Sequence, residues 1–290
     1  MTTPDPASTD RPLVLTIGLS LGLGIAKLVA AVLTGSHAVL ASAADSLADS
    51  VVSAANLWLM RRARVPADDG HPYGHGKIEG LASLAQSAFL SAVVAGIAWR
   101  AVTSLLEPEP HAVLAAPALV VMGVSLVVSS GIAALLGRAA TRTGSLVLSA
   151  DAAHYRMDRW TAAATIAGLV GTLALNEPRA DSIAALAVCV IMARDVGSLL
   201  RDAVNELMDA ALSPEEMTRI KGVLDASRPL QLGWHDLRAR RSGPRRFVEV
   251  HVEIEKTATL LAAHEVAESI ENELRATIDG VEVIVHLDPA

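Results

Sequence analysis

The chain has one cysteine and few charged residues. Its single Cys189 excludes a disulfide within the chain and a cysteine-rich zinc knuckle. Only 19% of the 290 residues are charged and 52% are hydrophobic, which makes the chain more apolar than an ordinary soluble domain. The first ten residues lack the basic stretch of a signal peptide, so we expect no cleaved targeting segment. The net charge of −7 gives no indication of nucleic-acid binding.

Long apolar runs, in contrast, are abundant. A helix needs about 20 predominantly apolar residues to cross roughly 30 Å of hydrocarbon. Runs of this length predict a membrane α-helical bundle of six transmembrane helices, at about 12–34, 37–60, 81–106, 112–137, 145–174 and 180–200. The sequence becomes charged from about residue 208 onward. We therefore expect an N-terminal tail at 1–11, a transmembrane domain at 12–207 and a soluble domain at 208–290.

Lysine and arginine are distributed unevenly among the predicted loops. The loop after the second helix and the loop after the fourth are basic, whereas the third and fifth helices are followed by no basic residue and by Arg179 alone, respectively. The basic loops contain Arg61, Arg62, Arg64, Lys77, Arg138 and Arg142. Cytoplasmic loops carry such an excess, so both termini are expected in the cytoplasm.

Two predicted membrane helices carry ionisable residues at a spacing of four. Asp45 and Asp49 form one pair, and His154 and Asp158 form the other. This spacing places both members of a pair on one helical face, so two facing helices could offer three carboxylates and one imidazole to a single ion. Ionisable groups at membrane depth usually face the bundle interior and mark an ion pathway. An amphipathic helix on the membrane surface is the alternative for 37–60, but its polar face lacks the lysines and arginines that bind headgroups.

The donor set favours zinc. Imidazole suits zinc better than magnesium or calcium, and four nitrogen and oxygen ligands complete a tetrahedron around it. Copper binds such ligands more tightly still, so only its availability would exclude it. The ligands must lose their protons to bind metal, and an imidazole titrates within the physiological pH range. His154 could therefore exchange a proton for a metal ion.

A second group of possible ligands lies in the loop between the second and third helices. Asp68, His71 and His75 offer a carboxylate and two imidazoles within eight residues of a glycine- and proline-rich loop. Asp69 competes with Asp68 for the carboxylate role. An ordinary solvated loop is the alternative.

The soluble domain holds a third group of possible ligands. A helix at 213–226, strands at 233–241 and 246–255, a helix at 259–276 and a strand at 281–287 predict an α+β domain of order α-β-β-α-β, which is a small ferredoxin-like sheet with helices on one face. Its histidines are His235, His251, His264 and His286, accompanied by Asp288. His286 and Asp288 share one face of the last strand because they are two residues apart.

Three stretches resemble the cation diffusion facilitator family. They read AADSLADS at 43–50, HPYGHGKIEGLASLAQS at 71–87 and SADAAHYRMDRWTA at 149–162. The chain is most similar to bacterial dimeric zinc/proton antiporters of that family, over essentially its whole length after residue 10. The resemblance implies a homodimeric integral protein of the bacterial inner membrane that exports a divalent metal cation, Zn2+ foremost, in exchange for protons. Fe2+, Cd2+ and Co2+ remain alternative substrates.

The resemblance also assigns roles to each group of residues. Asp45, Asp49, His154 and Asp158 match the transport site between helices two and five, and three carboxylates with one imidazole are the zinc- and cadmium-type set. Further matches are a loop zinc site at Asp68, His71 and His75, and a binuclear zinc site near the dimer interface at His235, His251, His264, His286 and Asp288, with Asp288 bridging. Charge pairs at the waist of the dimer match Lys77 with Asp209 and Arg240 with Asp202.

Two other function classes fit less well. An intramembrane zinc hydrolase needs an open metal position and a general base, whereas the membrane site offers four protein ligands and no glutamate beside them. A membrane-anchored metal sensor would not need four ionisable residues at membrane depth. We therefore expect a transporter and no enzyme. Two residues stay unexplained. Lys27 could snorkel or pair with an interior carboxylate. Asp151 could form a hydrogen bond between helices, which is the preferred role, or a hydrogen bond that orients His154.

Overall fold

The structure is a computed structural model that describes residues 6–34, 37–106, 115–175, 179–227 and 231–290. The chain divides into two compact units. One is helical and combines Ala7–Arg61 with Leu81–Ala203. The other combines Arg62–Gly80 with Val204–Ala290, so the loop after the second helix belongs with the C-terminal domain.

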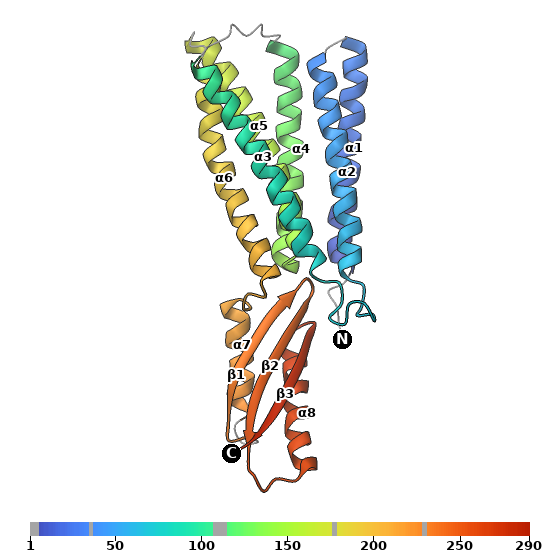
Figure 1. Ribbon diagram of the computed structural model, residues 1–290. Helices are drawn as coiled ribbons and strands as arrows, with labels where there is room; N and C mark the ends of the chain where they lie inside the picture. The colour runs from blue at the N-terminus through green and yellow to red at the C-terminus, as the bar shows by residue number, and fades with distance from the viewer. Residues whose placement is uncertain (1–5, 35–36, 107–114, 176–178, 228–230) are drawn as a thin grey trace. The chain divides into compact units, whose positions relative to one another are not determined.

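Long helices account for the apolar part of the described chain (Figure 1). They are α1 (Pro6–Thr34), α2 (His37–Ala63), α3 (Ile78–Leu106), α4 (Ala115–Thr143), α5 (Leu146–Leu175) and α6 (Ala180–Leu207). Four stretches within the described helices are long and apolar enough to cross a membrane: Thr9–Leu33, Ile78–Leu106, Met122–Thr143 and Ala180–Leu207. The other two predicted spans coincide with α2 and α5, the helices that carry the polar pairs. Those pairs lower the hydropathy of both helices.

Helix α5 lies between two apolar clusters of the helical unit. Its residues Leu148 and Tyr155 pack in one cluster with residues of α1, α2 and α4, including Leu13, Met60 and Leu136. Residues of α5 also pack in a second cluster with α3 and α6, including Ala153, Met157, Leu90, Met192 and the buried Cys189. Packing on both sides holds α5 in place, and with it the polar residues that α5 carries.

The C-terminal domain is a three-stranded sheet with two helices. Its elements are α7 (Pro214–Ala226), β1 (Gly233–Ser242), β2 (Arg245–Ile254), α8 (Leu260–Thr277) and β3 (Val281–Pro289). The strand order is β1-β2-β3, with β1 antiparallel to β2 and β2 parallel to β3. The parallel pairing requires a crossover connection, which α8 supplies. The order of elements follows the sequence-based prediction, and the predicted boundaries differ by a few residues.

Both helices cover the same face of the sheet (Figure 1). The inward residues of β2, Val248, Val250 and Val252, pack in one cluster with Leu224 of α7 and Ile270 of α8. Because side chains alternate along a strand, the residues between these valines point to the opposite face. The described helices of the domain do not cover that opposite face, and His251 lies on it.

The loop Arg62–Gly80 packs on the C-terminal domain through a glycine and an aromatic contact. Gly76 lies so close to the backbone of Ser242 that a side chain at position 76 would have no room. The ring of Tyr73 packs edge-on against Phe247 with centroids 5.7 Å apart, and the guanidinium of Arg240 lies 4.5 Å from the Phe247 ring. These contacts hold the loop, with its candidate ligands, against the C-terminal domain in one compact unit.

Candidate metal sites

The first site joins α2 to α5. Nε2 of His154 lies 2.8 Å from Oδ1 of Asp49 and 3.7 Å from Oδ2 of Asp158. Ligand atoms of these three half-buried residues all lie within 4.8 Å of one another. The spacing of four on α5 aligns His154 with Asp158, and Asp49 meets them from the facing helix. Two carboxylates and an imidazole therefore converge on one position.

One atom of this group has an unfulfilled hydrogen-bonding capacity. Oδ2 of Asp158 is buried and has no hydrogen-bond partner among the described residues. A buried carboxylate oxygen without a partner carries a desolvation cost that a bound cation would offset. The donor chemistry and the unpartnered oxygen both fit a divalent metal ion.

Asp45 is the predicted ligand that does not join this group. It is exposed and lies one turn before Asp49 on α2, outside the three residues whose ligand atoms come together. Its charge nevertheless interacts with Asp158. The structure thus brings three of the four predicted residues together. Asp45, the fourth, interacts with this group through its charge and lies outside it.

A network of hydrogen bonds supports the site at the next turn of both helices. Ser53 donates to Asp151 at 3.3 and 3.1 Å, and the Asn56 amide donates to Asp151 at 3.2 Å. The same Asn56 amide donates to Gln86 of α3 at 3.2 Å. Asp151 is fully buried and lies three residues before His154. It therefore ties α5 to α2, in line with the preferred interpretation of a hydrogen bond between helices.

The loop residues form a second group in the C-terminal unit. Asp68 faces both imidazoles, with Nδ1 of His71 3.4 Å from one carboxylate oxygen and Nε2 of His75 3.4 Å from the other. The centroids of the His71 and His75 rings lie 4.5 Å apart. The group that comes together contains Asp68, and the competing Asp69 is exposed beside it.

The turn itself holds the Asp68 carboxylate in its charged form. The backbone N–H of His71 donates to Asp68 Oδ1 at 2.7 Å, and this hydrogen bond, with the nearby imidazoles of His75 and His71, lowers the pKa of Asp68. A carboxylate that is ionised at lower pH is available to a metal over a wider pH range.

A third group lies on the open face of the sheet. His235, His251 and His286 are register partners across the three strands. The carboxylate of Asp288 lies 3.2 Å from His235 Nε2, 2.9 Å from His251 Nδ1 and 3.3 Å from His286 Nε2. The hydrogen bond with His251, followed by the charges of the imidazoles, lowers the pKa of Asp288. One carboxylate among three imidazoles is a donor set suited to zinc.

The composition of this third group differs from the prediction. His264 is exposed on α8 and is not among the residues that come together. Two acids that the sequence analysis did not single out lie close instead: Asp236, 3.6 Å from His235 Nδ1, and Glu253, 4.0 Å from His235 Nε2. Asp236 has a positive φ of 49°, beside a shift in register between β1 and β2. The alternation of side chains in a regular strand therefore could not predict that Asp236 lies beside His235.

The basic residues of both predicted charge pairs contact the same carboxylate, that of Asp209. Lys77 Nζ lies 3.1 Å from Asp209 Oδ2, and Arg240 donates to Asp209 Oδ1 at 3.0 Å. Asp202, the predicted partner of Arg240, belongs to the helical unit, so that pairing stays a prediction.

Comparison with known proteins identifies the family. Residues 13–208 match the model of the cation efflux transmembrane domain, and residues 212–290 match that of the cation efflux protein, cytoplasmic domain. The chain belongs to the cation diffusion facilitator family. It is an integral membrane protein of a family that transports metal cations out of the cytoplasm, and its C-terminal part is the cytoplasmic dimerisation domain of that family.

Named relatives of this cation diffusion facilitator include cation-efflux pumps. The chain is 36% identical to the cation-efflux pump FieF of Shigella flexneri over 256 residues, which cover 88% of this chain and 84% of that protein. It is 33% identical to FieF of Klebsiella pneumoniae over 281 residues, which cover 97% of this chain and 93% of that protein. A solved structure of CzrB in its zinc form is 34% identical over 27% of this chain and 90% of that chain, with a TM-score of 0.27.

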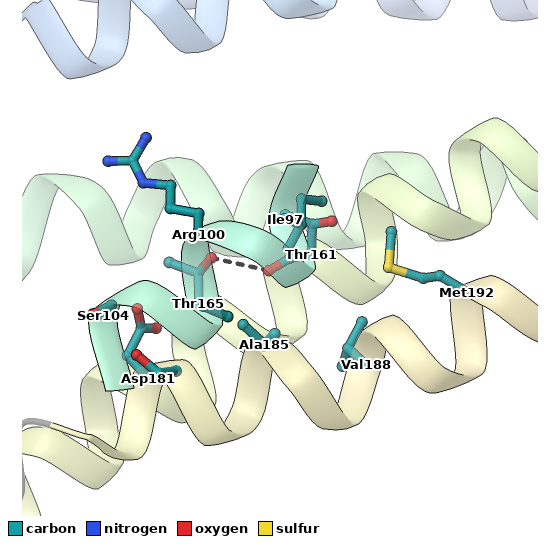
Figure 2. Close-up of a pocket in the computed structure, with 12 residues that line it drawn as sticks. Ile97, Arg100, Ser104, Thr161, Thr165, Asp181, Ala185, Val188 and Met192 are labelled. Carbon is teal, nitrogen blue, oxygen red and sulfur yellow. Dashed lines mark hydrogen bonds between the residues drawn. The ribbon is translucent and has the colours of Figure 1, made fainter. Parts of the chain in front are cut away.

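This cation diffusion facilitator also contains a cavity of about 260 Å³ between α3, α5 and α6 (Figure 2). Thr161 and Thr165 of α5 line it, and a hydrogen bond from the Thr165 hydroxyl to the Thr161 carbonyl occupies part of the polar lining. The guanidinium of Arg100 points away from the other labelled residues. None of the predicted ligands lines this cavity, so the candidate metal sites lie elsewhere in the described residues.

Proposed function

We propose that the protein exports a divalent transition-metal cation from the cytoplasm in exchange for protons, with Zn2+ as the preferred substrate. The transport site consists of Asp45, Asp49, His154 and Asp158, between α2 and α5. The observation that carries this proposal is the convergence of Asp49, His154 and Asp158 in the helical unit, with a buried Asp158 oxygen that lacks a hydrogen-bond partner among the described residues.

The donor set supports zinc as the substrate. Three carboxylates and one imidazole offer four hard or borderline ligands, which match the tetrahedral preference of Zn2+. Mg2+ and Ca2+ prefer oxygen ligands in larger coordination shells. Fe2+, Cd2+ and Co2+ accept the same donors, so a measurement of transport for each metal ranks them.

The exchange of metal for protons follows from the chemistry of these ligands. Each must lose its proton to bind a cation, so metal binding releases protons and protonation releases metal. Alternating access would present the site to the cytoplasm in one state and to the opposite side in the other, and a ligand changes this equilibrium only through its different affinity for the two states.

The wider architecture is proposed on the same basis. Six spans, including α2 and α5, form the transmembrane domain at 12–207, with the tail at 1–11 and a ferredoxin-like domain at 208–290. Both termini lie in the cytoplasm of a bacterial inner-membrane homodimer. Structural zinc stabilises the cytoplasmic part at two sites. One is the loop site of Asp68, His71 and His75, and the other is the site on the sheet, where Asp288 is the carboxylate shared among the imidazoles.

The experiment that tests the site is metal flux in proteoliposomes. Asp49→Ala should abolish Zn2+ flux because it removes the carboxylate that joins α2 to α5 at the site. Asp195→Asn is a matched control, since Asp195 is a half-buried membrane carboxylate that pairs with Arg156 at 3.0 Å outside the ligand group. Flux retained after Asp49→Ala would refute the site.

A further inference from the structure

A lysine is buried beside the transport site. Lys27 lies about two turns before the C-terminal end of α1, and only 7% of its surface is exposed. Its ammonium donates to the hydroxyl of Ser46 on α2 at 2.9 Å. Ser46 stands between Asp45 and Asp49 in the sequence, so the ammonium is anchored on the helix that carries two of the proposed ligands. An ammonium does not reach this depth without compensation.

Close packing of α1 against α2 places the lysine there. Gly24 lies against Leu47, where an added Cβ would come within 2.8 Å of the leucine side chain and 3.2 Å of its backbone nitrogen. One turn earlier, the hydroxyls of Ser20 and Ser50 are 2.9 Å apart and hydrogen-bonded. The absence of a side chain at Gly24 allows the helices to approach, and the ammonium of Lys27 then reaches Ser46 of α2.

Nearby carboxylates offset part of the cost of burying the ammonium. The positive charge of Lys27 interacts with Asp49, with Asp158 and with Asp45, in decreasing order. These are the three carboxylates of the proposed transport site. With a neutral imidazole, three carboxylates and one ammonium carry a net charge of two minus, which a divalent cation neutralises.

We propose that Lys27 is a fixed counter-charge that sets the metal affinity of the transport site. The inference rests on the proposed function, because it takes the three carboxylates to be ligands of the transported cation. The ammonium lowers the negative potential at the site, so a divalent cation binds less tightly and leaves faster. A transporter needs this balance, since a site that binds too tightly does not release its ion.

The test is to measure the KM and the maximal rate of Zn2+ flux separately for each variant. Lys27→Met keeps the length of the side chain and removes its charge. We expect the KM for Zn2+ to fall about tenfold, because the repulsion between the ammonium and the metal is gone. The maximal rate should fall as well, because release from the tighter site is slower. Lys27→Arg should restore both values toward those of the unaltered protein.

Three further measurements make the outcome decisive. Ser20→Ala removes a hydrogen bond between the same two helices without a change in charge, and its KM should stay near the unaltered value. If Lys27→Met does not yield a monodisperse protein, Lys27→Gln replaces it, and its KM should fall in the same direction. A KM that is unchanged or raised in the folded neutral variant would overturn the proposal, because a purely structural lysine predicts that result. Zn2+ flux in Asp49→Ala tests the proposed transport site by itself. Flux retained in that variant would refute the site, whereas an unchanged KM in the neutral Lys27 variant would refute only the role of the lysine.

Discussion

Nε2 of His154 and Oδ1 of Asp49 lie 2.8 Å apart, which joins α5 to α2 at a half-buried position in the helical unit. The two residues are 105 positions apart in the sequence. Each helix carries an acid one turn from its member of this contact, Asp158 on α5 and Asp45 on α2. The contact therefore defines the centre of the proposed transport site, and the surrounding residues can be tested according to how they support it.

Removal of the buried Asp151 carboxylate should loosen this arrangement. Asp151→Ala removes the buried acceptor to which both the Ser53 hydroxyl and the Asn56 amide donate, and leaves the Asn56 amide only its hydrogen bond to Gln86. We expect a loss of about 1–3 kcal/mol in the free energy of unfolding and weaker Zn2+ transport, measured by thermal unfolding in detergent and by flux. Asp151→Asn retains a carbonyl oxygen as acceptor and should lose less than the alanine variant. Equal losses in the two variants would show that the acceptor oxygen is not what matters.

The Asp288 carboxylate should control zinc binding on the sheet. Asp288→Ala removes the acid that contacts three imidazoles, so the rise in Tm that Zn2+ produces in the cytoplasmic domain should be largely lost. His264→Ala is the comparison, because His264 lies outside this group in a single chain. An equally large loss in His264→Ala would instead assign that histidine to the metal site.

A side chain at position 76 should disrupt the contact between the loop 62–80 and the C-terminal domain. Gly76→Ala places a methyl group against the Ser242 backbone, where there is no room. We expect a destabilisation of about 1–3 kcal/mol and faster amide hydrogen exchange in residues 66–77. Gly70→Ala is the matched control in the same loop, since its nearest contact would be an Asp68 side-chain oxygen at 3.4 Å. Unaltered exchange in Gly76→Ala would contradict the close contact.

Acid should weaken the start of α7 through Glu216. Burial opposes ionisation of this carboxyl, but the hydrogen bond from Arg246 at 3.0 Å and the contacts with the capping residue Ser213 outweigh burial and lower the pKa of Glu216 below its ordinary value of 4.5. A lowered folded-state pKa stabilises the fold above pH 4.5, and this stability is lost as the pH falls through the folded-state pKa.

Glu216→Gln removes that contribution. At neutral pH it should lower the free energy of unfolding of the domain by about 1 kcal/mol, and the difference from the unaltered protein should shrink as the solution is acidified. Urea unfolding at a series of pH values measures both effects. A difference that stays constant down to pH values below about 3 would contradict the role of the ionised carboxyl.

Periodic features of the sequence predicted much of this fold. The apolar runs correspond to α1–α6, and the alternation around Val248–Val252 corresponds to a strand with one face in the core. The spacing of four predicted that His154 and Asp158 share a helical face, and the structure brings Asp49 to them from α2. Their binding of metal stays a prediction. These patterns are local, so they can be found without knowledge of tertiary contacts.

Other features depend on tertiary contacts that no local pattern encodes. The proximity of Asp236 and Glu253 to His235 follows from the strand register and its shift. The association of the loop with the C-terminal domain depends on Gly76 and Ser242, which are far apart in the sequence. The burial of Lys27 on Ser46 likewise depends on the approach of α1 to α2 at Gly24. His264 is assigned as a ligand from the family resemblance alone, and its binding of metal stays a prediction because it lies outside the group formed by the described residues of one chain.

Zn2+ flux driven by a pH gradient, with the unaltered protein beside His154→Ala and His154→Asp, tests the central claim most directly. If metal and protons compete for the quartet of Asp45, Asp49, His154 and Asp158, the gradient should accelerate flux in the unaltered protein. The alanine variant should lose or weaken that response, because the imidazole that exchanges a proton for the metal is gone. The aspartate variant should keep four ligands and shift the selectivity toward metals that prefer oxygen donors. An unaltered response to the gradient in His154→Ala would contradict the account.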